Sequence, residues 1–286
     1  MPHAELNIST HPRGPILSFH PLIVGDFNFW AFSAVTEDVL EALRRVRCVI
    51  FPQVFPETLY HLARERGLSV FPSYDYRFRF PGKGGQYLLF RTLGLPCPQS
   101  LWIPKIASLG PHPQAAAVKW PRMPFVVKID QEHEGRGLFL VRDERDLKEA
   151  LERIRTFERE GRYGFLVQEY LPSPHDLRVV IIGPRLLTFW RKLGPDFRTN
   201  LAQGGEIIPC PDPELEEKAL ALARELSRKT GINLAAIDFL FREGEALLNE
   251  INYVFGRRAL GEGYEELLFE AVTWFLESSE PRESER

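Results

Sequence analysis

The sequence has few cysteines and no long apolar run. Only three cysteines occur among 286 residues, Cys48, Cys97 and Cys210, far apart and without a Cys-x-x-Cys pair. This spacing argues against a disulfide framework and against a thiolate zinc site. No apolar stretch approaches the roughly 18 to 20 residues that cross a bilayer, and the first residues lack the basic-then-apolar order of a secretory signal. We therefore expect a protein of the reducing cytoplasm without a membrane partner.

An excess of charge of either sign is also missing. Lysine and arginine number 36 against 39 aspartates and glutamates, which gives a net charge of -3 at pH 7. Nucleic-acid binding depends on a surplus of basic residues, so no nucleic acid is expected as a partner. Any phosphate binding must then be local. The sequence does not decide between a monomer and a homo-oligomer.

Strand and helix signals alternate at the N-terminal end. Between residues 14 and 75, apolar runs of strand length alternate with two amphipathic stretches, which predicts a small parallel α/β unit. Thr36 is expected to cap the first helix, and Gly67 to end the second. A second α+β unit with one charged helix follows, and a third contains a long helix and a pair of strands. We place these three units at residues 1–79, 80–171 and 172–286.

The predicted hairpin "AAIDFLFREGEALLNEIN" carries polar side chains on one face. A loop of three residues, Glu243 to Glu245, would place Asp238 directly across from Glu250, with Asn252 on the same face. Two like charges in opposition destabilise a bare sheet, so a positive group is expected nearby. Two carboxylates and an amide suit Mg²⁺, which prefers oxygen ligands. The alternative is that one carboxylate faces solvent or pairs with a neighbouring arginine.

Other polar positions interrupt apolar or glycine-rich stretches. Lys128 lies inside the strand "FVVKI", where a lysine is seldom buried without an anionic partner. Gly135 and Gly137 flank Arg136 in the following loop, so backbone N–H groups can approach phosphate oxygens, although such a pair is more often a plain turn. Lys83 lies in "FPGKGG", which lacks the spacing of a Walker-type P-loop. The sequence therefore indicates phosphate contacts without a P-loop.

Taken in order, these stretches resemble the ATP-grasp superfamily, most closely RimK-type glutamate ligases and glutathione synthetases. The series runs "GKGGQYLLFRTLGLPCP", "PFVVKI" with a glycine loop, "LVQEYL", "DLR", "FRTNLAQGG", "AAIDFL" and "NEIN", and covers about residues 80 to 256. The resemblance implies an α/β (α+β) ATP-grasp fold, in which a small parallel α/β domain precedes two α+β subdomains that grip ATP.

The resemblance also implies cofactors and contacts: ATP with one or two Mg²⁺ ions, or Mn²⁺ in their place. Arg178 would steady the reacting carboxyl and phosphoryl groups, and Arg198 would reach the terminal phosphates. Asp238, Glu250 and Asn252 would hold the metal. The segment Gln168, Glu169, Tyr170 and Leu171 would hold adenine by backbone hydrogen bonds, with Glu169 in the hinge and Asp176 nearby toward the ribose. The other implied nucleotide contacts are Lys83, Lys128, Gly135, Gly137, Thr199 and Asn200.

The activity implied by the resemblance is that of an ATP-dependent carboxylate-amine ligase. A carboxylate attacks the γ-phosphate of ATP to give an acyl phosphate, and an amine then displaces phosphate to form an amide. The substrates would be a small carboxylate and an amino acid or peptide, with glutamate as the added residue. A small-molecule kinase and a non-catalytic module that binds Mg-ATP are the alternatives.

Several further residues are candidates for the substrate cleft. His20 follows a strand at the edge of the parallel sheet where ligands usually bind, with structural packing as the alternative. Arg257 and Arg258 would clamp a carboxylate in a bidentate contact, or else begin a solvated helix. His133 and His175 are interpreted as solvated loop residues. The stretch "NYVFGRR" replaces the small residue, proline and glycine that commonly follow the metal-binding asparagine in the family, and so leaves the acceptor undefined.

Overall fold

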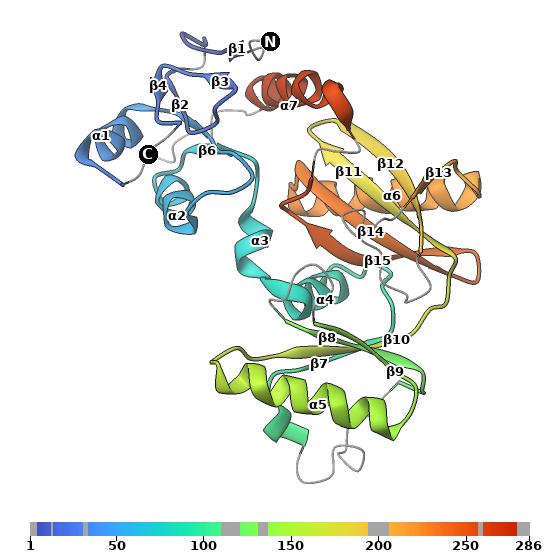
Figure 1. The fold of residues 1–286 in the computed structure, drawn as a ribbon. Coiled ribbons are helices and arrows are strands. Elements are labelled where there is room, and N and C mark those ends of the chain that lie inside the picture. The colour runs from blue at the N-terminus through green and yellow to red at the C-terminus, as the bar shows by residue number, and fades with distance from the viewer. Residues whose placement is uncertain are drawn as a thin grey trace.

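The structure is a computed structural model that describes residues 5–12, 14–30, 34–109, 121–130, 137–193, 206–256 and 260–278. Three main sheets follow one another along the chain, each covered by helices. Figure 1 shows the N-terminal unit beside the C-terminal sheet, and the central sheet with its helix at the far end of the molecule. The mixed α/β fold expected from the sequence is confirmed.

The N-terminal unit is built on a four-stranded sheet in the order β4-β2-β5-β6, with every pair parallel. Its two inner strands, β2 and β5, are completely buried, as in parallel sheets generally. Thr36 occupies the N-cap position of α1 as predicted, although its side chain makes no capping hydrogen bond, and Gly67 follows α2 with φ +72° as expected. The elements are β1 Leu6–Asn7, β2 Ile16–Ser18, β3 Ile23–Val24, β4 Phe27–Asn28, α1 Glu37–Arg45, β5 Cys48–Ile50, α2 Glu57–Glu65 and β6 Ser69–Phe71.

The central unit is an antiparallel sheet in the order β7-β10-β8-β9 with helix α5 against it. Asp143 begins the helix by accepting a hydrogen bond from the backbone N of Asp146 at 2.9 Å. The buried side chains of this unit form a hydrophobic core of their own. The elements are β7 Ser100–Ile103, the 3₁₀ helix η1 Ile106–Leu109, β8 Phe125–Ile129, β9 Leu138–Val141, α5 Glu144–Arg159 and β10 Phe165–Glu169.

The C-terminal unit is a five-stranded sheet in the order β13-β12-β11-β14-β15. It shares one continuous hydrophobic core with the N-terminal unit. The last helix contributes to this junction, because the rings of Phe71 and Phe275 lie 5.5 Å apart between their centroids. The elements are β11 His175–Ile182, β12 Arg185–Lys192, β13 Ile207–Ile208, α6 Pro213–Thr230, β14 Leu234–Arg242, β15 Glu245–Asn252, the 3₁₀ helix η4 Gly261–Gly263 and α7 Tyr264–Ser278.

Two helices, α3 Asp75–Arg79 and α4 Gly82–Thr92, connect the N-terminal unit to the rest. Helix α4 lies between the central and C-terminal sheets in Figure 1 and contacts strands of both. From this helix, Gln86 Nε2 donates to the carbonyl oxygen of Ile251, and the backbone N of Ile251 donates to Gln86 Oε1, both at 2.8 Å. The side chain of Gln86 thus occupies the place of a neighbouring strand at the edge of the C-terminal sheet.

The turn between β14 and β15 differs from the prediction. Arg242 pairs with Glu245, not with Ala246, so the loop has two residues instead of three. Both loop residues have positive φ, 52° at Glu243 and 78° at Gly244, as in a type I′ turn. This turn twists in the same sense as the strands that it joins, which explains why the shorter loop forms.

A β-bulge restores the predicted pairing farther along the hairpin. Phe239 pairs with Leu248 while Asp238 pairs with Glu250, so Asn249 is the extra residue of the bulge. Without the bulge, the two-residue turn would place Asn249 across from Asp238. The predicted opposition of Asp238 and Glu250 is therefore confirmed, although a bulge produces it and not the length of the loop.

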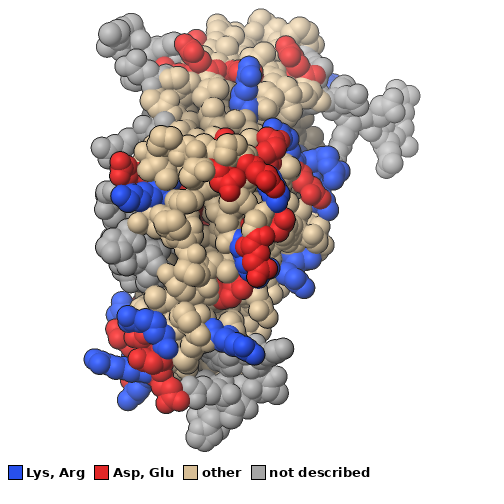
Figure 2. All heavy atoms as spheres, turned by 90° about the vertical axis from the view of Figure 1, so that its right-hand side faces the viewer, with Lys and Arg blue, Asp and Glu red and all other residues tan. Residues whose placement is uncertain are grey.

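Charges of both signs are mixed over the surface. On the face that Figure 2 shows, lysines and arginines are interspersed with aspartates and glutamates. Exposed pairs of this kind include Arg224 with Glu217 on α6, at 3.0 Å. No helix in the described ranges combines the length and the apolar character that crossing a membrane requires.

The turn gives a first testable prediction. Glu243 holds a left-handed backbone conformation that asparagine adopts more readily. We expect Glu243→Asn to raise the free energy of unfolding by about 0.5 to 1 kcal/mol, measured by urea denaturation. Glu243→Gln keeps the same backbone preference and should leave stability unchanged. Equal effects of the two substitutions would contradict this account of the turn.

Candidate active site

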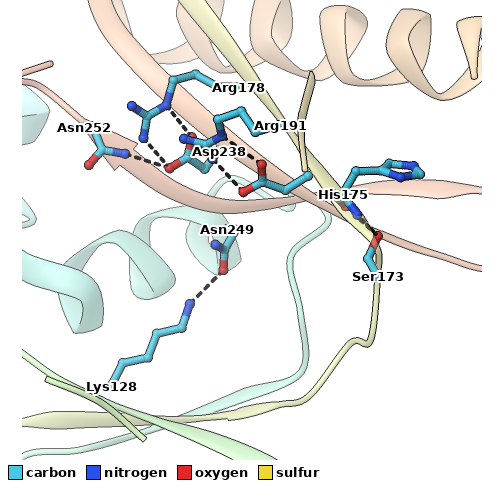
Figure 3. Close-up of polar contacts among 9 residues, drawn as sticks. Lys128, Ser173, His175, Arg178, Arg191, Asp238, Asn249 and Asn252 are labelled. Carbon is cyan, nitrogen blue, oxygen red and sulfur yellow. Dashed lines mark hydrogen bonds and ion pairs between the residues drawn. The ribbon is translucent and has the colours of Figure 1, made fainter. Parts of the chain in front are cut away.

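Asp238 on β14 is the centre of a buried ion-pair network. Arg178, its partner across the strands on β11, donates from Nε to Oδ1 and from Nη2 to Oδ2, both at 2.7 Å. Arg191 on β12 adds an ion pair of 3.0 Å to Oδ1, and Asn252 Nδ2 donates to Oδ2 at 3.1 Å. Figure 3 shows all three side chains directed at this carboxylate. The positive group expected beside the opposed carboxylates is thus provided by two guanidinium groups.

Arg191 is a site residue that the sequence analysis missed. Its side chain is 3% exposed, and it donates to both carboxylate oxygens of Asp176, at 2.8 and 2.6 Å. A signal for this pair exists in the sequence. A two-residue turn at Gly183 and Pro184 places Asp176 opposite Arg191, and an arginine within the apolar stretch "LLTFWRKL" needs a carboxylate partner.

The network sets the charge state of Asp238. Burial alone would raise the pKa of this carboxyl group, but the charges of Arg191 and Arg178 and the hydrogen bond from Arg178 outweigh it. The pKa of Asp238 therefore lies below its ordinary value. The carboxylate is ionised at neutral pH, as a cation-binding group must be.

Lys128 enters the site from the central sheet. It is buried on β8, and its Nζ donates to Oδ1 of Asn249, the bulge residue, at 2.7 Å. Burial lowers the pKa of Lys128 to about 8, an effect that Glu250 and Asp238 oppose and Lys83 reinforces. This lysine is therefore charged at neutral pH and loses its proton slightly above it. The bulge thus serves two purposes, since it turns Glu250 toward Asp238 and supplies the acceptor for Lys128.

The glycine run around Lys83 is the first turn of α4 and not an open loop. The backbone N of Lys83 donates to Oδ1 of Asp130 at 2.5 Å. Gly82 has φ +70°, and a Cβ placed there would lie 2.1 Å from the same oxygen. A Cβ at Gly84 would lie 2.2 Å from Nε1 of Trp102. These glycines are required because the Asp130 carboxylate and the Trp102 ring approach the helix so closely.

The predicted hinge links the central sheet to the β14–β15 hairpin. Glu169, the last residue of β10, accepts hydrogen bonds on Oε1 from the backbone N of Gln99 at 2.6 Å and from Arg242 Nη1 at 2.7 Å. Gln168 is buried, and its Nε2 donates to Ser100 Oγ at 3.2 Å. Both side chains are used in structural contacts, and the backbone N of Glu169 donates to the carbonyl oxygen of Gln99 at 2.9 Å, so the adenine contacts of this segment stay a prediction.

The remaining predicted residues are placed as follows. His20 is buried after β2, where its Nδ1 accepts a hydrogen bond from the backbone N of Leu22 at 3.2 Å. His175 begins β11, with its ring 5.2 Å from that of Trp190. Tyr170 and Leu171 follow β10 and are half-buried, and the carbonyl oxygen of Gly137 accepts from the N of Ile129. The predictions for Gly135, Arg198, Thr199, Asn200, Arg257, Arg258 and His133 lie outside the described residues.

The chemistry of the predicted metal ligands fits a divalent cation. Asp238 pairs across the strands with Glu250 and is hydrogen-bonded to Asn252, so three oxygen-bearing side chains meet where β14 and β15 lie together. No group of three or more His, Cys, Asp or Glu side chains suited to a metal occurs in the part of the chain that the structure describes. Mg²⁺ accepts such a sparse set, because it retains waters and takes phosphate oxygens as further ligands. Arg178 would have to share an oxygen of Asp238 with the ion.

Solved structures with a similar fold define the fold class of the protein. D-alanine–D-alanine ligase from Bacillus anthracis in complex with ATP matches 89% of this chain and 86% of that one, with a TM-score of 0.61 and 16% identity. A RimK domain ATP-grasp protein from Sphaerobacter thermophilus matches 79% of this chain and 80% of its own, with a TM-score of 0.58 and 17% identity. The fold is that of the ATP-grasp proteins.

Within this class, the chain belongs to the RimK-like ATP-grasp domain family, whose model matches residues 113–261. The resemblance deduced from the sequence is confirmed. A probable alpha-L-glutamate ligase of Stenotrophomonas maltophilia (strain R551-3) is 27% identical over 134 residues, 45% of this chain and 43% of that protein. Probable alpha-L-glutamate ligase 2 of Shewanella frigidimarina is 24% identical over 161 residues, 54% and 51% of the two chains. The matched region is about half the length of these relatives.

The buried network predicts an unequal effect of two arginines on β12. Arg191→Met leaves Asp176 and Asp238 buried without their shared cation, so we expect it to lower the free energy of unfolding by about 3 to 5 kcal/mol. Arg185→Met removes an exposed pair with Glu270 on the same strand and should change stability little. Urea denaturation followed by tryptophan fluorescence measures both. Similar midpoints for the two variants would contradict the role given to Arg191.

Proposed function

We propose that the protein is an ATP-dependent ligase that joins a carboxylate to an amine. The observation that carries the proposal is the network around Asp238, which keeps an ionised carboxylate beside Glu250 and Asn252 while Lys128 faces them from the central sheet. Membership of the RimK-like ATP-grasp domain family supports it, because this superfamily binds ATP, typically with Mg²⁺.

Each charged side chain has a proposed task in the reaction. Lys128 offers its ammonium group to the phosphates of ATP. Arg178, on the same face of the C-terminal sheet as Asp238, offsets the charge that develops on the transferred phosphoryl group. Asp238, Glu250 and Asn252 would hold Mg²⁺, which would neutralise charge on phosphate oxygens. Lys83, at the start of α4, adds positive charge near Lys128. No covalent enzyme intermediate is needed, so the side chains act by position and charge.

The reaction then proceeds in two transfers. A carboxylate oxygen of the first substrate attacks the γ-phosphorus of ATP, and the bond to the bridging oxygen breaks so that ADP leaves with the electron pair. The amine of the second substrate attacks the acyl carbon, the bond to the phosphate oxygen breaks, and inorganic phosphate leaves. The amine loses a proton to solvent as the amide forms.

The substrates are proposed from the family and from the chemistry of the site. The relatives named as probable alpha-L-glutamate ligases favour glutamate as the added amino acid and a carboxylate-bearing small molecule or peptide as its acceptor. We place the reaction in the reducing cytoplasm, since Cys48, Cys97 and Cys210 are all free thiols. The proposed domain boundaries are those given above, at residues 79/80 and 171/172.

Nucleotide binding tests the role of Lys128. We expect wild-type protein to bind Mg-ADP in a calorimetric titration, with an affinity that falls as pH rises through about 8, because Lys128 loses its positive charge there. Lys128→Met should bind at least about tenfold more weakly and show no such break with pH. Lys105→Met is a matched control, since this exposed lysine lies against the ring of Tyr163 on the central unit. An unchanged affinity of Lys128→Met would exclude the proposed contact.

Product analysis tests the chemistry itself. Incubation with Mg-ATP, L-glutamate and pools of carboxylates and amines should release ADP and phosphate in equal amounts, with an amide product visible by mass spectrometry. Arg178→Met should slow turnover by about 100-fold or more, because it removes a charge directed at the transition state. Circular dichroism of the same sample shows whether the variant is folded. A stable phosphorylated product without free phosphate would instead indicate a kinase, and Mg-ATP binding without turnover a non-catalytic module.

A further inference from the structure

Two buried polar atoms lack a hydrogen-bond partner in the described part of the chain: Nε2 of Gln53 and the hydroxyl oxygen of Tyr253. Buried polar atoms in native proteins are nearly always paired, so an unpaired one calls for an explanation. The two atoms belong to the same small region. The backbone N of Phe255, two residues after Tyr253, donates to Oε1 of Gln53 at 3.1 Å. Both unpaired groups therefore lie where the N-terminal unit meets the segment after β15.

A positive charge without a carboxylate partner lies in the same region. Arg77 on α3 donates from Nη1 to the backbone oxygen of Gln53 at 2.9 Å. Its guanidinium carbon lies 5.1 Å from the ring centroid of Tyr74 and 5.9 Å from that of Tyr253. None of the described carboxylates forms an ion pair with Arg77. Asp75, two positions earlier, is already bound by Arg64 and by the hydroxyl group of Tyr60.

The position of these three side chains in the fold favours a ligand site. Gln53 follows β5 and Arg77 follows β6, so both lie beyond the carboxyl ends of parallel strands, where open α/β sheets bind their ligands. Tyr253 directly follows Asn252, one of the proposed metal ligands. Figure 1 shows α3 between the N-terminal sheet and the sheets that would enclose ATP. A molecule held here would reach toward the proposed phosphoryl-transfer site.

We propose that Arg77, Gln53 and Tyr253 bind a carboxylate group of the amino-acid or peptide substrate. The identification of this ligand as a substrate rests on the ligase function proposed above. The guanidinium supplies charge, and the unpaired amide and phenol groups each have a hydrogen bond to donate, which together match the oxygens of a carboxylate. The unusual "NYVFG" stretch then carries part of the substrate specificity.

Stability gives the first test, because a buried hydroxyl group that has no partner until a ligand binds lowers the stability of the free protein. Tyr253→Phe removes a buried group that has no partner, and it should raise the urea midpoint of the free protein. Tyr60→Phe is the matched control. Its hydroxyl donates to Asp75 and accepts from the backbone N of Tyr74, so its loss should lower the midpoint. A drop in the midpoint of Tyr253→Phe like that of Tyr60→Phe would show that the Tyr253 hydroxyl is structural, and would overturn the proposal.

Binding gives the second test, with L-glutamate, L-alanine and L-alanyl-L-alanine as probes and their fully amidated analogues as controls. Calorimetry in the presence of Mg-ADP should detect at least one carboxylate probe and not its amide. Affinity for that probe should fall about tenfold in Tyr253→Phe and further in Arg77→Met, because hydrogen bonds to charged groups are lost. Mg-ADP affinity should be the same in both variants.

Chemical protection separates this proposal from the ligase function. Phenylglyoxal modifies accessible arginines, and the bound carboxylate probe should protect Arg77 in peptide mass spectrometry whether or not the protein turns over ATP. If the wild-type protein does not bind Mg-ADP, the proposed ligase function is refuted, but the carboxylate site is not. If no probe binds or protects Arg77, or if the amides bind equally well, the carboxylate site is refuted even when nucleotide binds.

Discussion

The paired hydrogen bonds between Gln86 and Ile251 hold the candidate site together. β15 is an edge strand, and an open edge would expose its N–H and C=O groups between two sheets. The side-chain amide satisfies both groups at once, at the residue between Glu250 and Asn252. Because Gln86 lies on the helix that starts at Gly82 beside Asp130, the same contact fixes the proposed metal ligands relative to the end of β8.

The charged side chains near this contact differ in how much of each is exposed to solvent. Asp176 and Arg191 form an inner pair that is removed from solvent, and Arg191 also reaches Asp238, so the network ends on a carboxylate held by two guanidinium groups. Arg178 is the more exposed of the two, so in the proposed reaction it is the one that would exchange Asp238 for a phosphoryl group. Arg191 would then keep Asp238 oriented, as outer partners do for the ligands of metal ions.

Much of this could be read from the sequence, and the failures have physical causes. The strand-helix alternation and the opposition of Asp238 and Glu250 follow from hydrophobic pattern, which records which face is buried. The bulge at Asn249 could not be predicted, because its partner Lys128 is 121 positions away in the sequence. Thr36 is at the N-cap position but makes no capping hydrogen bond. The glycines around Lys83 allow close packing against Asp130 and Trp102 and do not form a phosphate loop.

The separate hydrophobic core of the central unit affects which parts of the molecule can unfold locally. The N-terminal and C-terminal units share one apolar interior, whereas β7 to β10 and α5 enclose another. Among the described residues, polar contacts such as Lys128 with Asn249 and Glu169 with Arg242 join the second body to the first. Local unfolding of the central unit would therefore leave the apolar core of the other two units intact.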